Sequence, residues 1–146
     1  MPKRINNQEK NNRKYISKNT DVNVDAFDRN GNNTFVFISI KNIQPNYECF
    51  SDWSKSELSK FWKFNKRLHN MTWQQVYATA SKEDKRGLAY TVIPRDKYGD
   101  NDFMATLDKE IKMFELRVDD EMRVHGYRMN ATFFLCFLDR EHKICK

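Results

Sequence analysis

Cysteine, glycine and proline are all scarce in this chain. Among 146 residues there are three cysteines, four glycines and three prolines. The cysteines, Cys49, Cys136 and Cys145, are odd in number and far apart, and none forms a C-x-x-C pair. This pattern argues against a disulfide framework and against a zinc site built from thiols. Cys136 lies in an apolar run, so we predict that it is a small core residue.

Long hydrophobic runs are also missing. No apolar stretch approaches the roughly 20 residues of a membrane-spanning helix, and the N-terminus lacks the apolar core of a signal peptide. We therefore expect no membrane partner and a cytoplasmic location, where reducing conditions suit unpaired cysteines.

Apolar residues and basic charge are abundant. The chain is 39% hydrophobic and 14% aromatic, which is enough for one packed core rich in rings. Its formal net charge is +6, which suits a polyanionic partner such as RNA or DNA. An ordinary basic protein carries the same charge, so composition leaves both interpretations open.

The N-terminal residues differ from the rest. Residues 1–33 hold nine asparagines, and residues 1–20 hold six Lys or Arg against one acid, Glu9. Such a segment buries too little apolar area to offset its ordering entropy. We predict a basic, Asn-rich flexible tail over 1–33 and a single α+β domain over 34–146, with a loop-rich insertion at 81–112. The tail either follows a phosphate backbone or is a solvated leader without a role.

A strand and two helices open the domain. Residues 34–43 are rich in β-branched and aromatic side chains and predict a strand. Two capping boxes then predict helices over 55–69 and 73–80, joined as an αα-hairpin. The capping pairs are Ser54 with Glu57 and Thr72 with Gln75.

The apolar residues of these helices raise a choice between core and binding platform. Leu58 and Trp62 fall on one stripe of the first helix, and Trp73 and Tyr77 recur at helical spacing in the second. Such aromatics can stack on bases, but at this spacing among other apolar residues we predict that they face the core.

The last part of the domain predicts a three-stranded meander, over 113–118, 122–129 and 132–138. If the acidic loop 119–121 joins the first two strands, Val118 faces Met122. The numbers of any two residues that face each other across these antiparallel strands then add up to 240. Arg117 then opposes Arg123, and Glu115 opposes His125, all on one face of the sheet.

Two opposed arginines repel each other unless something lies between them. An anion would make the arrangement favourable, because arginine binds phosphate through two hydrogen bonds. A solvated face with Glu115 offsetting the arginines explains the pattern equally well, and another register is the remaining alternative. Arg128 falls on the opposite face in strict alternation, so it joins the group only through a bulge near Gly126.

Histidine adds acid–base chemistry to this face. RNA cleavage needs a base for the 2′-hydroxyl proton, an acid for the leaving oxygen, and cations for the phosphorane-like transition state. His142 is alternatively a turn residue whose ring bonds backbone beside Asp139. We predict no metal and no cofactor. The candidate catalytic residues are His125, His142, Glu115 and Arg123, and the candidate RNA- or phosphate-binding residues are Arg117, Arg128, Arg140, Lys143 and Tyr127.

The stretches FELRVDDEMRVHGYR and FFLCFLDREHKI, with the βααβββ order, give a family resemblance. The domain resembles the RelE/ParE-type small toxin superfamily, whose RNase members cut mRNA on the concave face of the meander without a metal. The helical string FWKFNKRLHNMTWQQVY, with these stretches, also looks like small uncharacterised proteins of bacterial mobile elements and phages. This chain adds a tail and an insertion, and the same fold includes gyrase poisons and non-catalytic members.

The expected fold is therefore α+β with βααβββ order, a RelE-like helical hairpin packed on one face of a mostly antiparallel sheet. The resemblance implies a metal-independent endoribonuclease or translation-targeting toxin. Its partners would be mRNA, free or ribosome-bound, and an antitoxin or host protein. The alternative is a non-catalytic RNA- or protein-binding module of a phage or mobile element.

Overall fold

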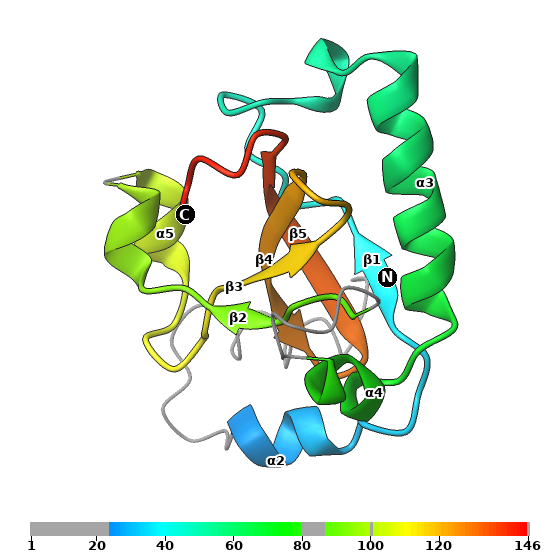
Figure 1. The fold of residues 1–146 in the computed structure, drawn as a ribbon. Helices are drawn as coiled ribbons and strands as arrows, with labels where there is room; N and C mark the ends of the chain where they lie inside the picture. Colours follow the sequence, from blue (N-terminus) through cyan, green and yellow to red (C-terminus); the bar gives the residue numbers. More distant parts are fainter. Residues whose placement is uncertain (1–23, 80–86, 100, 146) are drawn as a thin grey trace, which may run out of the picture.

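The computed structural model of the protein describes residues 24–79, 87–99 and 101–145 (Figure 1). Our predictions for residues 1–23, for the end of the second helix at residue 80 and for residues 81–86 of the insertion lie outside the described part of the chain. The described elements are α2 (Val24–Arg29), β1 (Phe37–Ser39), the 3-10 helix η1 (Phe50–Asp52), α3 (Lys55–His69), α4 (Trp73–Ala78), β2 (Thr91–Val92), the 3-10 helix η2 (Arg95–Tyr98), α5 (Asp102–Thr106), β3 (Phe114–Arg117), β4 (Arg123–Met129) and β5 (Thr132–Asp139).

The strands form one five-stranded mixed sheet in the order β1-β5-β4-β3-β2. Strand β1 pairs with β5 in parallel, and the other neighbours are antiparallel. The predicted α+β class is confirmed. The first strand is shorter than the predicted 34–43, because the chain on either side of it bonds elsewhere. Before the strand the amide of Val36 donates to the carbonyl of Met71 at 3.0 Å, and after it the amide of Ile43 donates to the carbonyl of Ile40 at 3.3 Å in a turn.

Both predicted helix starts are confirmed. Ser54 and Thr72 accept hydrogen bonds from the backbone of the third helical residue, and Glu57 and Gln75 bond back to the caps. Helix α3 spans the predicted range. Helices α3 and α4 bury part of their apolar residues, with Phe64, Leu68, Trp73 and Val76 among them, against one face of the sheet. This face carries the larger core.

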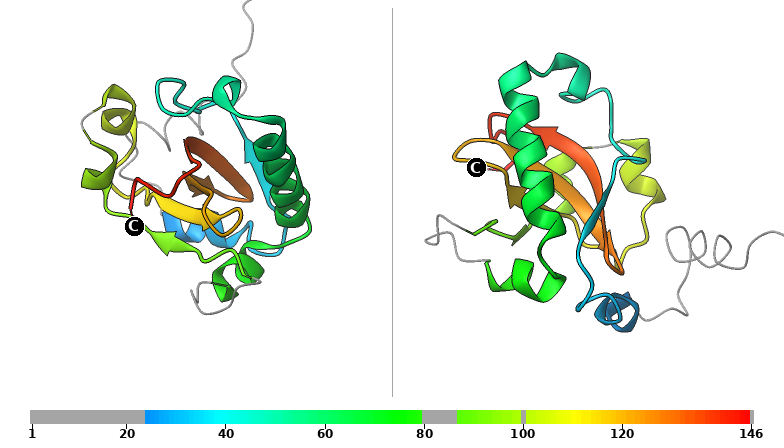
Figure 2. Two further views of the ribbon diagram at one scale, coloured as in Figure 1. Left: turned by 45° about the horizontal axis from the view of Figure 1, so that its top comes forward. Right: turned by 90° about the vertical axis from the view of Figure 1, so that its right-hand side faces the viewer.

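The opposite face of the sheet is covered by the segment that the sequence analysis assigned to an insertion. Residues 87–99 and 101–112 form β2, η2 and α5, so much of the predicted loop has regular structure. Met104 and Leu107 pack with Met113, Tyr127 and Phe137 in a second core. Helices α3 and α5 therefore lie on opposite sides of the sheet (Figure 2).

Residues 24–33, placed in the tail by the sequence analysis, are instead attached to the domain. The carboxylate of Asp28 accepts from the amide of Asn130 at 2.8 Å, and the amide side chain of Asn130 donates to the carbonyl of Phe27 at 3.0 Å. The turn after α2 comes so close that a Cβ on Gly31 would lie 2.5 Å from the carbonyl carbon of Asn130. These contacts hold α2 at the β4–β5 turn.

The prediction that Leu58 and Trp62 face the core is wrong. Leu58 is 43% exposed and Trp62 is 56% exposed. The buried side of α3 runs instead through Phe64 and Leu68, with Phe61 packed against the core. Trp73 is fully buried as predicted, whereas Tyr77 is 37% exposed.

No helix in the described part of the chain is both long enough and apolar enough to cross a membrane.

Candidate functional site

The predicted register of the meander is confirmed. Glu115 pairs with His125, and Arg117 pairs with Arg123, across β3 and β4. Because directly opposed residues point to the same side of a sheet, all four side chains share one face. That face is the one toward η2 and α5, away from α3.

A bulge in β5 adds an aspartate to this face. The pairing of β4 with β5 shifts between His125 and Gly126, so that Cys136 is the extra residue. Strict alternation from Phe134 would turn Asp139 toward the helices. The bulge reverses that order, and Asp139 pairs with Arg123 on the polar face.

Gly126 permits the bulge. A Cβ at this position would lie 2.0 Å from the carbonyl oxygen of Phe134 and 2.8 Å from the ring of Phe133. Only a residue without a side chain lets the backbone of β5 come this close. The glycine thus determines indirectly where the Asp139 carboxylate lies.

His125 is at the centre of the polar residues and is fully buried. Its Nε2 lies 3.4 Å from Oδ2 of Asp139 and 3.6 Å from Oε2 of Glu115. Its Nδ1 lies 2.9 Å from the hydroxyl of Tyr98, which comes from η2. Burial raises the pKa of Tyr98, and Glu115 adds to the effect, so the hydroxyl keeps its proton. For a neutral ring we therefore assign Nδ1 as acceptor and Nε2–H as donor toward the carboxylates.

The Asp139 carboxylate organises the turn that follows β5. Its oxygens accept from the amides of Lys143 at 2.8 Å and Ile144 at 3.0 Å. Burial acts to raise the pKa of Asp139, but the nearby imidazole of His125 and the hydrogen bonds from these two amides outweigh it and hold the pKa below its usual value. The group is therefore an anion at neutral pH.

His142 lies in the turn that Asp139 organises and has a positive φ of 56°. Its Nε2 is 3.6 Å from Oε2 of Glu115, the same oxygen that faces His125. The His142 side chain is 26% exposed, whereas that of Glu115 is only 5% exposed. His142 is thus the imidazole of this cluster that solvent reaches.

Three buried side-chain atoms in this cluster form no hydrogen bond within the described part of the chain. They are Oε2 of Glu115 and the Nε2 atoms of His125 and His142. Since both imidazoles approach one carboxylate oxygen, a shift of a few tenths of an ångström would bond either of them. We call Tyr98, Glu115, His125, Asp139 and His142 the imidazole–carboxylate cluster.

Two arginines adjoin the cluster. Arg123 is 9% exposed and donates to the carbonyls of Asp119 at 2.8 Å and Met122 at 3.1 Å. Burial lowers its pKa, Glu115 opposes that effect, and Arg117 adds to it. Arg117 is less buried and donates to the carbonyl of Gly87 at 2.7 Å. Carbonyls and carboxylates therefore relieve the repulsion between the two guanidinium groups.

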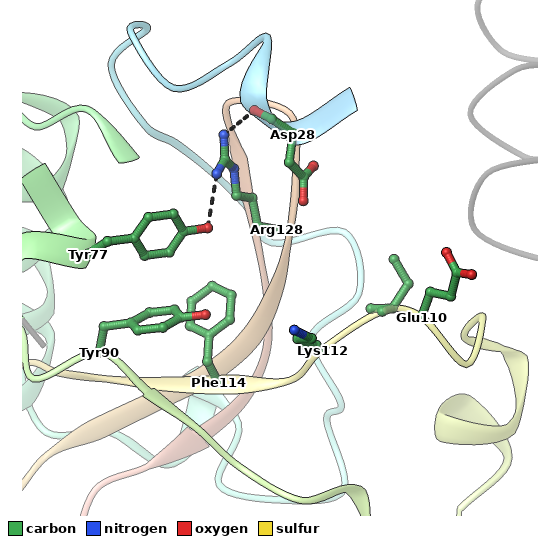
Figure 3. Close-up of a pocket in the computed structure, with 8 residues that line it drawn as sticks. Asp28, Tyr77, Tyr90, Glu110, Lys112, Phe114 and Arg128 are labelled. Atoms are coloured by element: carbon green, nitrogen blue, oxygen red, sulfur yellow. Dashed lines mark hydrogen bonds between the residues drawn. The ribbon is translucent and has the colours of Figure 1, made fainter. Parts of the chain in front are cut away.

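Arg128 is not part of this site. The bulge lies in β5 rather than in β4, so Arg128 stays on the helical face, where it is 4.9 Å from the centre of the Trp73 ring. It donates to the carbonyls of Asn130 and Asp28, the Asn32 side chain and the Tyr77 hydroxyl. It lines a separate cavity of about 130 Å³ with Tyr77, Tyr90 and Lys112 (Figure 3). Arg128 thus connects α2 and the turn after it to the sheet by hydrogen bonds.

The remaining candidates lie apart from the cluster. Tyr127 shares the face of His125 but is fully buried, and its hydroxyl accepts from Asn42 at 2.8 Å. Arg140 bonds the carbonyl of Asp52 and the carboxylate of Glu57, which connects the end of β5 to the start of α3. Lys143 is exposed and pairs with Glu141 at 2.9 Å.

Sequence reasoning missed two members of the cluster, Asp139 and Tyr98. The sequence suggested a bulge near Gly126 only as a way to reorient Arg128, whereas the bulge lies in the neighbouring strand β5 and turns Asp139 to this face. Tyr98 comes from the segment whose local pattern was least regular, and its ring stacks on Phe137 with centroids 5.1 Å apart.

The cluster has the groups that acid–base catalysis requires: an accessible imidazole, a carboxylate behind it, and cationic groups beside it. Among the described residues, no group of three or more His, Cys, Asp and Glu side chains is arranged to hold a metal ion.

Comparison with known proteins gives no relative: the chain matches no protein-family model, no curated protein and no solved structure.

Proposed function

We propose that the protein is an endoribonuclease that cleaves mRNA by metal-independent acid–base catalysis on the polar face of the meander. The observation that carries the proposal is the approach of His125 and His142 to one oxygen of Glu115, at 3.6 Å each, beside Arg117 and Arg123. The order of β1, the α3–α4 pair and the β3–β4–β5 meander supports a RelE-type toxin acting in the cytoplasm. An antitoxin or host protein would be its partner.

The burial of the cluster gives each residue a distinct role in this proposal. His142 is the catalytic residue that contacts RNA, because its side chain is the exposed imidazole. Glu115 orients that ring and takes up or returns its proton. His125 and Asp139 are positioning residues, since both are fully buried and hold Glu115 and the His142 turn. Arg123 and Arg117 stabilise the charge that develops on the phosphate.

The test is cleavage of an end-labelled mRNA fragment by purified protein, with and without ribosomes and with EDTA present. We expect cleavage in EDTA and a loss of about 100-fold or more in His142→Gln, the size typical of a missing general acid or base. Glu141→Gln is the control, because it changes an exposed side chain of the same turn. The proposal is contradicted if the wild type cuts the mRNA fragment neither with nor without ribosomes. It is also contradicted if His142→Gln keeps full activity and an unchanged melting temperature.

One observation favours a second candidate, a non-catalytic RNA-binding module. His125 and Asp139 are fully buried and Glu115 is 4% exposed, so most of the cluster lies below the surface. In that case the cluster only supports the turn, and the arginines bind the backbone of RNA. Salt-sensitive RNA binding would then survive in His142→Gln and weaken in Arg117→Gln, without cleavage by either.

A further inference from the structure

The edge of the sheet at β1 exposes an unusual number of large apolar side chains. Five of the seven exposed large hydrophobic residues of the described chain lie on or beside β1 and on α3. We call this set the β1–α3 surface; it consists of Phe35, Phe37, Ile40, Leu58 and Trp62, which are between 43% and 59% exposed. Clustered exposed apolar groups mark interaction sites more often than isolated ones do.

The two elements lie side by side (Figure 2). Leu58 and Trp62 are one helical turn apart on α3, and the same stripe continues through Asn65, Lys66 and His69. These last three residues line a groove of about 480 Å³ together with Val36, Phe37, Ile38 and Asn70. The exposed stripe of α3 therefore forms one wall of the groove, and β1 forms the other.

Strand β1 is an edge strand of the sheet. Edge strands pair readily with extended segments of other chains, and proteins usually protect them. Here the N-terminal end of the strand is covered, since Nδ1 of His69 lies 3.1 Å from the carbonyl oxygen of Val36. At the other end of the strand Ile40 follows β1 and is exposed.

The charge beside the groove is positive. Lys66 lies 5.5 Å from the centre of the Trp62 ring, and Lys55 falls on the same stripe two turns earlier. Lys41 follows β1 and is exposed. Within the described ranges, none of these three lysines has a carboxylate within 4.0 Å, whereas Lys60 on another side of α3 pairs with Asp119 at 3.0 Å. The surface thus combines apolar anchors with uncompensated cations.

We propose that the β1–α3 surface binds an extended, acidic, amphipathic segment of a partner protein. Its apolar side chains would fill the groove against Phe37 and continue along α3 over Trp62. Its carboxylates would pair with Lys41, Lys55 and Lys66. The aliphatic side chains of Ile40 and Leu58 and the strand edge favour an extended peptide over single-stranded RNA, which uses mainly stacking rings and a continuous basic track. The proposal is independent of the imidazole–carboxylate cluster, whose residues come from β3, β4, η2, the end of β5 and the turn after it, and not from β1 or α3.

The test uses the full chain and a fluorescein-labelled synthetic peptide of alternating valine and glutamate. Two control peptides are matched to it. In the valine–lysine peptide lysine replaces every glutamate, and in the serine–glutamate peptide serine replaces every valine. We expect the valine–glutamate peptide to bind and the other two to bind at least about tenfold more weakly, by fluorescence anisotropy at low salt. Equal binding of the valine–lysine peptide would overturn the proposal.

Variants place the binding on this surface. We expect Trp62→Ala to weaken binding by about tenfold or more, as for an aromatic anchor. Lys66→Glu should weaken it as well and should increase binding of the valine–lysine peptide, a gain that misfolding cannot produce. Val92→Ala is the control, because Val92 is 49% exposed on β2, at the other edge of the sheet.

Three results would overturn the proposal. The first is peptide binding that is unchanged in Trp62→Ala and Lys66→Glu. The second is binding of oligouridine that depends on Trp62 while the peptide does not bind, which would assign the surface to nucleic acid. The third is self-association of the free chain that Trp62→Ala abolishes, measured by sedimentation, which would assign it to a second copy.

Discussion

Replacing Asp139 by asparagine removes one negative charge from the interior and leaves the shape of the side chain almost unchanged. The wild-type carboxylate is fully buried and accepts from the amides of Lys143 and Ile144 at 2.8 and 3.0 Å. An asparagine has one acceptor oxygen, so one of these amides loses its partner. The remaining bond becomes a neutral one. The substitution therefore tests how strongly the carboxylate holds the turn that carries His142.

The expected loss follows from these contacts. A hydrogen bond to a charged group contributes about 1.5–3 kcal/mol, and an amide left without a partner costs a similar amount. We expect the free energy of unfolding of Asp139→Asn to be about 2–4 kcal/mol below that of the wild type at pH 7. Urea denaturation followed by tryptophan fluorescence measures this difference.

The difference should depend on pH in one direction. The pKa of Asp139 is lower in the folded protein than in an unfolded chain, where an aspartate titrates near 3.9. The carboxylate thus stabilises the fold above about pH 4, and that contribution is lost as the pH falls through the lower, folded pKa. Because asparagine does not titrate, the gap between the two proteins should narrow in acid.

Glu141→Gln is the matched control, since Glu141 lies in the same turn but is exposed. Its unfolding curve at pH 7 should superimpose on that of the wild type. A destabilisation of Asp139→Asn below about 0.5 kcal/mol, within the range of ordinary surface changes, would refute the argument. So would a gap that stays constant from pH 7 to acid conditions in which both proteins still fold.

Two further predictions concern the bulge and the thiols. Gly126→Ala should lower the free energy of unfolding by about 3 kcal/mol, measured by urea denaturation, because the new Cβ would lie 2.0 Å from the carbonyl oxygen of Phe134. At an ordinary strand glycine alanine is stabilising, so a stabilised variant would contradict the close approach of the two strands. In native protein at neutral pH, a thiol reagent should label Cys49, whose pKa is lowered by hydrogen bonds from Ser51, and should spare the buried Cys136, whose pKa is raised by desolvation. Cys49→Ser should remove a labelling phase that Cys136→Ser leaves intact, and the opposite pattern would refute the assignment.

Local signals predicted the parts of the fold that depend on neighbouring residues. Both capping boxes and the full length of α3 follow from side chains within a few positions of each helix start. The register that opposes Glu115 to His125 follows from the length of one acidic loop and from alternation along two strands. These features need no information from distant parts of the chain.

Features that depend on distant contacts could not be predicted in this way. Helix α3 has apolar residues on two adjoining sides, and its sequence does not say which side meets the sheet, so Trp62 was placed in the core. The bulge at Cys136 requires the close approach of two strands at Gly126, which the alternation pattern hides. The parallel pairing of β1 with β5 likewise joins opposite ends of the domain.

The attachment of α2 and β1 has a consequence for the order in which the protein folds. Asn130 bonds Asp28, which lies 102 residues earlier in the chain, and β1 pairs with β5 across a comparable separation. Contacts of such long range form slowly, whereas the β3–β4–β5 meander is local and can form early. During synthesis, however, even the meander must wait for its last strand. The imidazole–carboxylate cluster therefore cannot assemble until the turn with His142 has left the ribosome, so any activity of this site begins only after the whole meander has been synthesised.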